Sequence, residues 1–136
     1  MAAAKAMCKL AHVKMLKAQL DMANNIPHEE QHYYEVADYA QNLGIPHVGS
    51  EQPGDTYYSS PKTIYEFSIA NVTQQPTQLN AYVYEEETGV KGGNNVASLL
   101  VHDLQKKGWI KEGNSLKSLT IILDNCGGQN KNKYVL

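Results

Sequence analysis

The chain has 136 residues, of which 42% are hydrophobic and 19% charged. This length allows one domain with a hydrophobic core, and the composition excludes an intrinsically disordered protein. No apolar run approaches the roughly 20 residues that cross a bilayer, and residues 1–10 lack the apolar segment of a secretory signal. We therefore expect a protein of the nucleus or cytoplasm that is not secreted, with Cys8 and Cys126 reduced.

The net charge of −2 is unevenly distributed along the chain. Residues 1–25 hold four Lys and one Asp (+3), residues 29–87 hold ten acidic residues and one Lys (−9), and residues 91–136 hold seven Lys and three acidic residues (+4). The middle would repel a phosphate backbone and the two ends would attract one. The chain has no Arg, the residue favoured for bidentate phosphate contacts. Either Lys residues bind nucleic acid or the basic segments are solvated surfaces.

The first half of the chain predicts a helix, a strand and a long loop. Residues 2–23 contain no Gly or Pro and have a strong helix composition, although their apolar positions form no single stripe. Residues 32–37 are aromatic and β-branched, which predicts a strand leading to Asp38. Residues 42–62 are interrupted by several Gly and Pro and predict a loop.

The pattern then predicts a hairpin, because residues 63–72 and 79–85 both alternate and are separated by a turn with Pro76.

After the hairpin, apolar residues at helical spacing predict a helix over residues 96–107, with Asn94 or Asn95 as its N-cap and Gly108 at its end. Residues 116–123 are apolar and lack alternation toward their end, which favours a central strand buried on both faces. The sequence therefore predicts an α/β fold with a mixed sheet and an N-terminal helix.

Two acids follow strands in matching places. Asp38 comes after the first predicted strand, and Asp124 comes after the last one. If these strands are neighbours, both carboxylates can bind one hard cation such as Mg²⁺, for which oxygen is the preferred ligand. The alternative is that each Asp only stabilises a turn.

Residues 124–132 (DNCGGQNKN) form the most unusual stretch of the chain. A strand, a Gly turn and the start of a helix can together bind an anion. The spacing matches neither GxGxxG nor GxxxxGKS, so no nucleotide fingerprint is present. A Rossmann-like phosphate binder remains a further alternative, and it predicts an all-parallel sheet. Whether the turn is an anion site of another fold or part of a Rossmann-like binder, the side chains available to contact phosphate are Gln129, Asn130, Lys131 and Lys133.

Four segments resemble, in order and spacing, a transposon-derived family that is similar to DDE transposases and has a ribonuclease H-like core. They are VADYAQN at residues 36–42, QPGDTYY at 52–58, KGGNNVASLL at 91–100 and LDNCGGQNKNKYVL at 123–136. The resemblance implies three antiparallel strands, a helix and a central parallel strand. It divides the chain into an N-terminal helix over residues 1–27 and a partial, truncated core over residues 28–136.

The same resemblance implies a catalytic and metal-binding role for Asp38 and Asp124, with Mg²⁺ or Mn²⁺ as the cofactor and DNA as the partner of a full-length family member. A third acid, expected on a later helix, is missing from the chain. Two functions therefore stay open. The chain is part of a transposase- or integrase-like nuclease core, or it is a catalytically inactive remnant that serves as a structural or binding module. Because two acids without the third should bind metal weakly and cleave DNA poorly, we expect the chain as given to be the inactive remnant.

Overall fold

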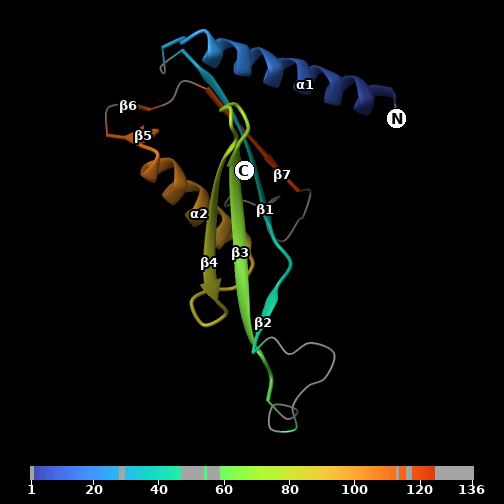
Figure 1. Cartoon of the computed structure of the whole chain (residues 1–136), viewed down its shortest axis with the longest axis vertical. Helices are drawn as coiled ribbons and strands as arrows, with labels where there is room; N and C mark the ends of the chain where they lie inside the picture. Colours follow the sequence, from blue (N-terminus) through green and yellow to red (C-terminus); the bar gives the residue numbers. More distant parts are fainter. Residues whose placement is uncertain are drawn as a thin grey trace.

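The structure is a computed structural model that describes residues 2–27, 30–46, 54, 59–112, 114–115 and 118–124 (Figure 1). Its elements in chain order are α1 (Ala2–Ala23), β1 (His32–Tyr39), β2 (Leu43–Ile45), β3 (Lys62–Asn71), β4 (Gln78–Glu85), α2 (Gly93–Lys106), β5 (Ile110–Lys111), β6 (Asn114–Ser115) and β7 (Ser118–Leu123).

Within the described residues the predicted helices and strands are present, β5 and β6 were not predicted, and two further differences lie near β1. The helix start predicted after the Gly turn lies outside the described residues. Strand β1 continues to Tyr39, so Asp38 lies inside it and not after it. The three-residue strand β2 lies within the stretch predicted to be a loop, and it is too short to show an alternating pattern.

The main sheet has five strands and is mixed. Strand β3 pairs antiparallel with β1, β2 and β4, whereas β1 and β7 are parallel. The strand order is therefore β4–β3–β1–β7, with β2 also beside β3 and α2 connecting β4 to the far side of the sheet. Strands β5 and β6 form a separate small hairpin. The antiparallel β3–β4 hairpin excludes the all-parallel sheet that a Rossmann-like phosphate binder requires.

The hydrophobic core lies between α2 and one face of the sheet. Val96 and Leu100 of α2 pack with Ala37, Phe67 and Ile69 from β1 and β3. A second cluster, further along α2, joins Tyr33, Leu104 and Trp109. Burial of these large side chains holds the helix on the sheet and fixes which face of each strand points inward.

Helix α2 has a different N-cap from the one predicted. The cap is Gly92, which has an extended backbone and no side-chain cap, and Asn94 and Asn95 lie within the helix. The amide of Asn95 instead donates to the Val90 carbonyl. The predicted end is confirmed, because Gly108 has a φ of 71° and its N–H donates to the Gln105 carbonyl.

Helix α1 lies across one end of the sheet and extends sideways past β7 (Figure 1). The side chain of Gln19 donates to the Val72 carbonyl, and the Gln31 amide donates to the Ala18 carbonyl. The helix thus contacts the sheet near the beginning of β1. Neither helix of the described ranges has the length and apolar composition that a membrane crossing needs.

The sheet face opposite α2 is largely exposed beyond the region that α1 contacts, and we call it the open face. In alternation with the inward residues, the strands place these side chains on it: Val36, Asp38, Glu66, Ala70, Leu79, Ala81, Val83 and Ile122.

Strand β7 was predicted to be buried on both faces, and this prediction is wrong for the described residues. Ile122 keeps 44% of its surface exposed, and within the described ranges β7 pairs with β1 alone.

Candidate functional site

The two predicted acids lie at the same end of two neighbouring strands. The parallel register pairs Ala37 with Leu123, and both of these side chains pack on the core beneath α2. Asp38 follows Ala37 within β1 and therefore lies on the opposite face of the sheet, and Asp124 follows directly after the end of β7. Both residues are exposed. The prediction that the first and last strands are adjacent is confirmed.

This pair of carboxylates has the chemistry of a hard-cation site. Neighbouring strands are about 4.8 Å apart, so side chains at the ends of two such strands can bind the same ion. One oxygen of Asp38 also accepts a hydrogen bond of 2.8 Å from the backbone N–H of Tyr39, which restrains the carboxylate. Within the described ranges, no group of three or more His, Cys, Asp or Glu side chains is placed to hold a metal ion.

The other predicted contacts with nucleic acid cannot be placed. The side chains of Gln129, Asn130, Lys131 and Lys133 lie outside the described residues, as does the Gly turn before them.

A second charged group, which the sequence analysis missed, is buried between α2 and the sheet. Lys107 contacts the carboxylates of Glu35 and Asp103, and all three side chains are almost completely buried. The other oxygen of Asp103 accepts hydrogen bonds from Asn80 (2.7 Å) and Tyr82 (2.6 Å). This cluster joins α2 to β1 and β4 through charged side chains in the interior.

Burial and contacts shift the two carboxyl groups in opposite directions. Burial raises the pKa of Glu35 above its ordinary value, and the contact with Lys107 offsets only part of that effect. Burial also raises the pKa of Asp103, but the hydrogen bonds from Lys107, Tyr82 and Asn80 outweigh it, so the pKa is lowered overall. The cluster therefore favours the ionised form of Asp103 more than that of Glu35.

Two signals in the sequence could have revealed this cluster. Asp103 occupies an apolar-spaced position of α2 together with Val96 and Leu100, and Lys107 follows it one turn later. Glu35 alternates with Tyr33 and Ala37, the inward residues of β1. An acid at an inward position needs a partner, and each of these acids has one.

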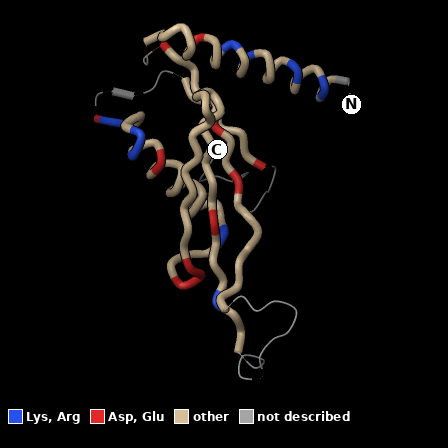
Figure 2. Tube along the Cα trace, in the orientation of Figure 1, with Lys and Arg blue, Asp and Glu red and all other residues tan. Residues whose placement is uncertain are grey.

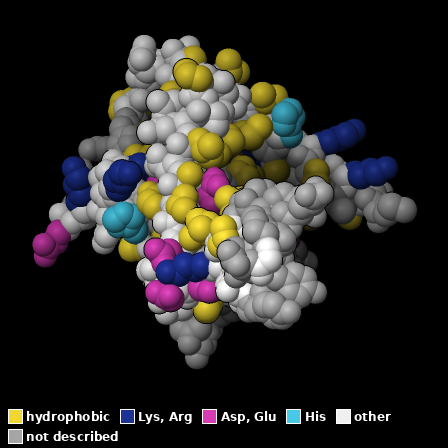
Figure 3. Space-filling view, turned by 60° about the horizontal axis from the view of Figure 1, so that its bottom comes forward, with side chains coloured by type: hydrophobic (Ala, Val, Ile, Leu, Met, Phe, Trp, Pro, Cys, Tyr) yellow, Lys and Arg dark blue, Asp and Glu magenta, His cyan; other side chains and the backbone are white. Residues whose placement is uncertain are grey.

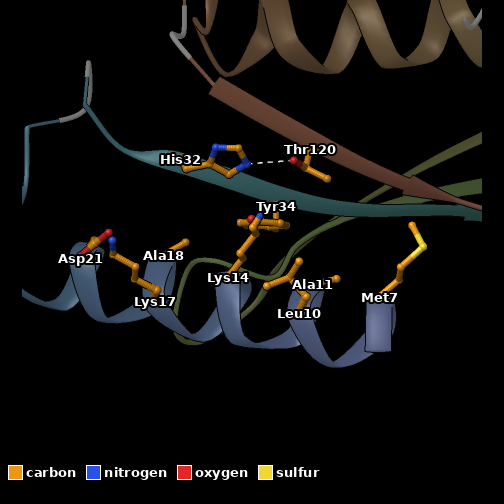
Figure 4. A pocket seen from close by; sticks show the side chains of 10 residues that line it. All are labelled: Met7, Leu10, Ala11, Lys14, Lys17, Ala18, Asp21, His32, Tyr34 and Thr120. Atoms are coloured by element: carbon orange, nitrogen blue, oxygen red, sulfur yellow. Dashed lines mark hydrogen bonds between the residues drawn. The ribbon is translucent and has the colours of Figure 1, made fainter. Parts of the chain in front are cut away.

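A groove of about 570 Å³ lies between α1 and the beginnings of β1 and β7. Figure 4 shows α1 on one side of β1 and β7 and a second helix on the other. His32 lies at the sheet side of this groove, where its Nε2 is 2.8 Å from the Thr120 hydroxyl and its Nδ1 contacts the Ser118 hydroxyl. Because both ring nitrogens have hydroxyl partners, the structure assigns His32 to holding β1 beside β7.

The charges of the folded chain are separated in space. Lysines follow one another along α1, whereas acidic positions predominate on the strands of the main sheet (Figure 2). On the surface, hydrophobic side chains form a broken strip with acidic side chains among and beside them (Figure 3).

Comparisons of the chain with known protein families, with curated proteins and with solved structures found no match. Function is therefore argued from the geometry of the chain.

Proposed function

We propose that this chain forms part of a ribonuclease H-like core, of the kind found in DDE transposases, in which Asp38 and Asp124 hold a divalent cation that acts on DNA phosphodiesters. The observation that supports the proposal is the parallel pairing of β1 with β7, in which Ala37 and Leu123, the residues directly before the two acids, are in register.

The topology supports this proposal independently of the acids. Three antiparallel strands, a crossing helix and a strand parallel to the first give the order β4–β3–β1–β7. This order agrees with the fold that the resemblance of the sequence implies. Asp38 in β1 and Asp124 directly after β7 also correspond to the positions where that fold carries its first two carboxylates.

The donor set fits Mg²⁺ or Mn²⁺. Both carboxylates are exposed, offer hard oxygen ligands and leave room for water, and Mg²⁺ in proteins keeps several waters and binds one or two carboxylates. Such an ion, when bound, polarises a phosphoryl oxygen and lowers the pKa of water. The roles of the chain are to hold the ion through Asp38 and Asp124 and to restrain Asp38 through the Tyr39 N–H. The proposed contacts with DNA are Gln129, Asn130, Lys131 and Lys133.

A catalytically inactive remnant is the second candidate function. It is favoured by the absence of a third metal ligand near the acid pair within the described ranges and by the absence of Arg from the whole chain. In this case the acids still bind a cation weakly, and the fold serves as a structural or binding module.

Both candidate functions require that Asp38 and Asp124 bind a cation. Titration with Mn²⁺, followed by amide NMR, tests this binding. We expect paramagnetic broadening centred on the carboxyl ends of β1 and β7. Asp38→Asn and Asp124→Asn should each weaken this binding by about ten-fold or more, the effect expected for losing one charged ligand. Glu112→Gln, which changes an exposed acid outside the main sheet, is the matched control and should bind as the wild type does.

A nuclease assay with labelled DNA separates the two candidates. Cleavage that needs Mn²⁺ and is lost in Asp124→Asn would establish the nuclease. Localised Mn²⁺ binding without cleavage would establish the inactive module. If broadening is absent from both strand ends, or persists in both variants, the shared metal site is wrong.

A further inference from the structure

Helix α1 exposes apolar side chains on most of its circumference. Met7, Leu10, Val13, Leu16 and Leu20 all keep more than two fifths of their surface exposed, up to 72% for Met7. A helix that is apolar all round is normally buried. The groove beneath α1 accounts for Met7 and Leu10, which line it, but not for the other three.

The remaining three residues lie on the side of α1 that points away from its own sheet. Ala18, which is 3% exposed, marks the side that contacts the sheet. At about 100° per residue, Val13, Leu16 and Leu20 lie about 140° to 160° away from Ala18. Lys9 lies about 180° away and continues the same line toward the N-terminus. We call Lys9, Val13, Leu16 and Leu20 the outer stripe of α1.

The open face carries an apolar row beside acidic residues, which complements the apolar and basic outer stripe of α1. The strand registers align Leu79, Ala70, Val36 and Ile122 in one apolar row across the four main strands. Leu79 is 62% exposed, and Val83, two residues along β4, is 64% exposed. Carboxylates lie next to this row, and these are Asp38, Glu66 and Asp124.

We propose that the open face binds the outer stripe of α1 from a second copy of this chain, in a two-fold symmetric dimer. Charge complementarity selects this occupant. Lys14 and Lys17 line the groove beneath α1, but Lys5 and Lys9 lie on its outer side, and the acidic residues Asp38, Glu66 and Asp124 lie beside the apolar row of the open face. Asp38 and Val36 are separated by about 7 Å along β1, and Lys9 and Val13 are one helical turn, about 6 Å, apart. A lysine and a valine of one copy thus meet an aspartate and a valine of the other.

The shape of the chain favours the same arrangement. Helix α1 stands on one end of this sheet face, so the uncovered rows beside it are recessed by the thickness of one helix, about 10 Å. When two copies face each other, each α1 fills the recess of its partner and the two helices lie side by side between the sheets. Such an interface is isologous and closes on itself, as in most homodimers.

Sedimentation equilibrium of the full chain in EDTA tests the proposal. The expected mass is about twice the 15.1 kDa of one chain. Leu16→Asp on the outer stripe and Leu79→Lys on the open face should each weaken dimerisation by about ten-fold or more, because each places a charge in an apolar contact. Val101→Asp is the matched control, since Val101 is 46% exposed on α2, and this variant should dimerise as the wild type does.

Disulfide cross-linking then identifies the two surfaces that meet. With Cys8 and Cys126 replaced by Ser, a chain carrying Leu16→Cys mixed with one carrying Ala81→Cys should give a covalent heterodimer. A monomeric wild type, or a dimer that persists in both Leu16→Asp and Leu79→Lys, would falsify the proposal. Far-ultraviolet circular dichroism verifies that the variants are folded. Because EDTA removes divalent ions, failure of the proposed metal site leaves this result unchanged. A cation at Asp38 would compete with the lysine of the second copy, so the Mn²⁺ titration is made at a chain concentration below that at which the dimer forms.

Discussion

At the scale of single residues, Lys107 is the cation that compensates the charge of the buried carboxylates. Its amino group contacts Glu35 and Asp103, and its side chain is 8% exposed. The ammonium also lies 5.0 Å from the centre of the Trp109 ring. Lys107→Met removes the positive charge and keeps the length of the side chain. The free energy of unfolding should fall by about 3–5 kcal/mol, because two carboxyl groups remain buried without their cation. Urea denaturation measures the change.

Lys106→Met is the control for that substitution, because Lys106 precedes Lys107 on the same helix but is exposed. It should change the free energy of unfolding by no more than about 0.5 kcal/mol. Adding Glu35→Gln to Lys107→Met should restore part of the loss, since one uncompensated charge is then removed. Equal effects of Lys106→Met and Lys107→Met would show that the buried cluster contributes nothing specific.

At the scale of elements, the two ends of α2 depend on glycine for different reasons. Gly108 has a φ of 71°, and an added Cβ would approach the end of the flexible Lys111 side chain at 2.9 Å. Gly108→Ala should therefore lower the free energy of unfolding by about 1–2 kcal/mol, chiefly through the left-handed backbone. Thermal denaturation measures this loss. Gly108→Asn should cost less, because Asn tolerates this conformation.

At the N-cap of α2, a substitution for glycine should stabilise the fold. Gly92 is extended, and a Cβ there would meet no atom within 4 Å. Gly92→Ser should raise the free energy of unfolding by a few tenths of a kcal/mol, because the hydroxyl can accept from a free N–H of the first turn. Equal destabilisation of Gly108→Ala and Gly92→Ser would show that the backbone conformations of the two glycines do not determine the effect.

The elements were predictable from the sequence where their signals are local. The composition of α1, the alternation in the β3–β4 hairpin and the apolar run of β7 each predict the right element near the right residues. The burial of β7 was not predictable, because it depends on which strands and helices surround it. The same holds for the N-cap of α2, where Gly92 and Asn94 were both chemically suitable.

At the scale of the whole molecule, the candidate site was predicted in part. The adjacency of Asp38 and Asp124 follows from placing an acid at the end of two strands and then pairing the strands. The cluster of Glu35, Asp103 and Lys107 was missed because its members are far apart in the chain and meet only when α2 folds onto β1. Local patterns mark an inward acid, but only the tertiary fold identifies the cation that accompanies it.

This cluster gives the stability of the whole molecule a defined pH dependence. The pKa of Glu35 is raised in the folded state from an ordinary value of 4.5. As the pH rises from 4.5 to the raised value, the unfolded state loses its proton first, so the free energy of unfolding falls across that window. The pKa of Asp103 is lowered from an ordinary value of 3.8, so its contribution is lost as the pH falls below 3.8. The combined contribution of these two carboxyl groups is therefore largest between their ordinary values, pH 3.8 and pH 4.5.

Urea denaturation of the wild type and of Glu35→Gln, from about pH 3 to about pH 8, measures this dependence through the proton linkage. Glutamine keeps the size of the side chain and removes its titration. The free energy of the wild type relative to the variant should decline as the pH rises above 4.5 and then become constant. Titrating groups outside the buried cluster are common to both proteins, so they cancel in the comparison. Parallel curves for the two proteins would mean that Glu35 titrates alike in the folded and unfolded chains, and that burial in the cluster does not disfavour its charge.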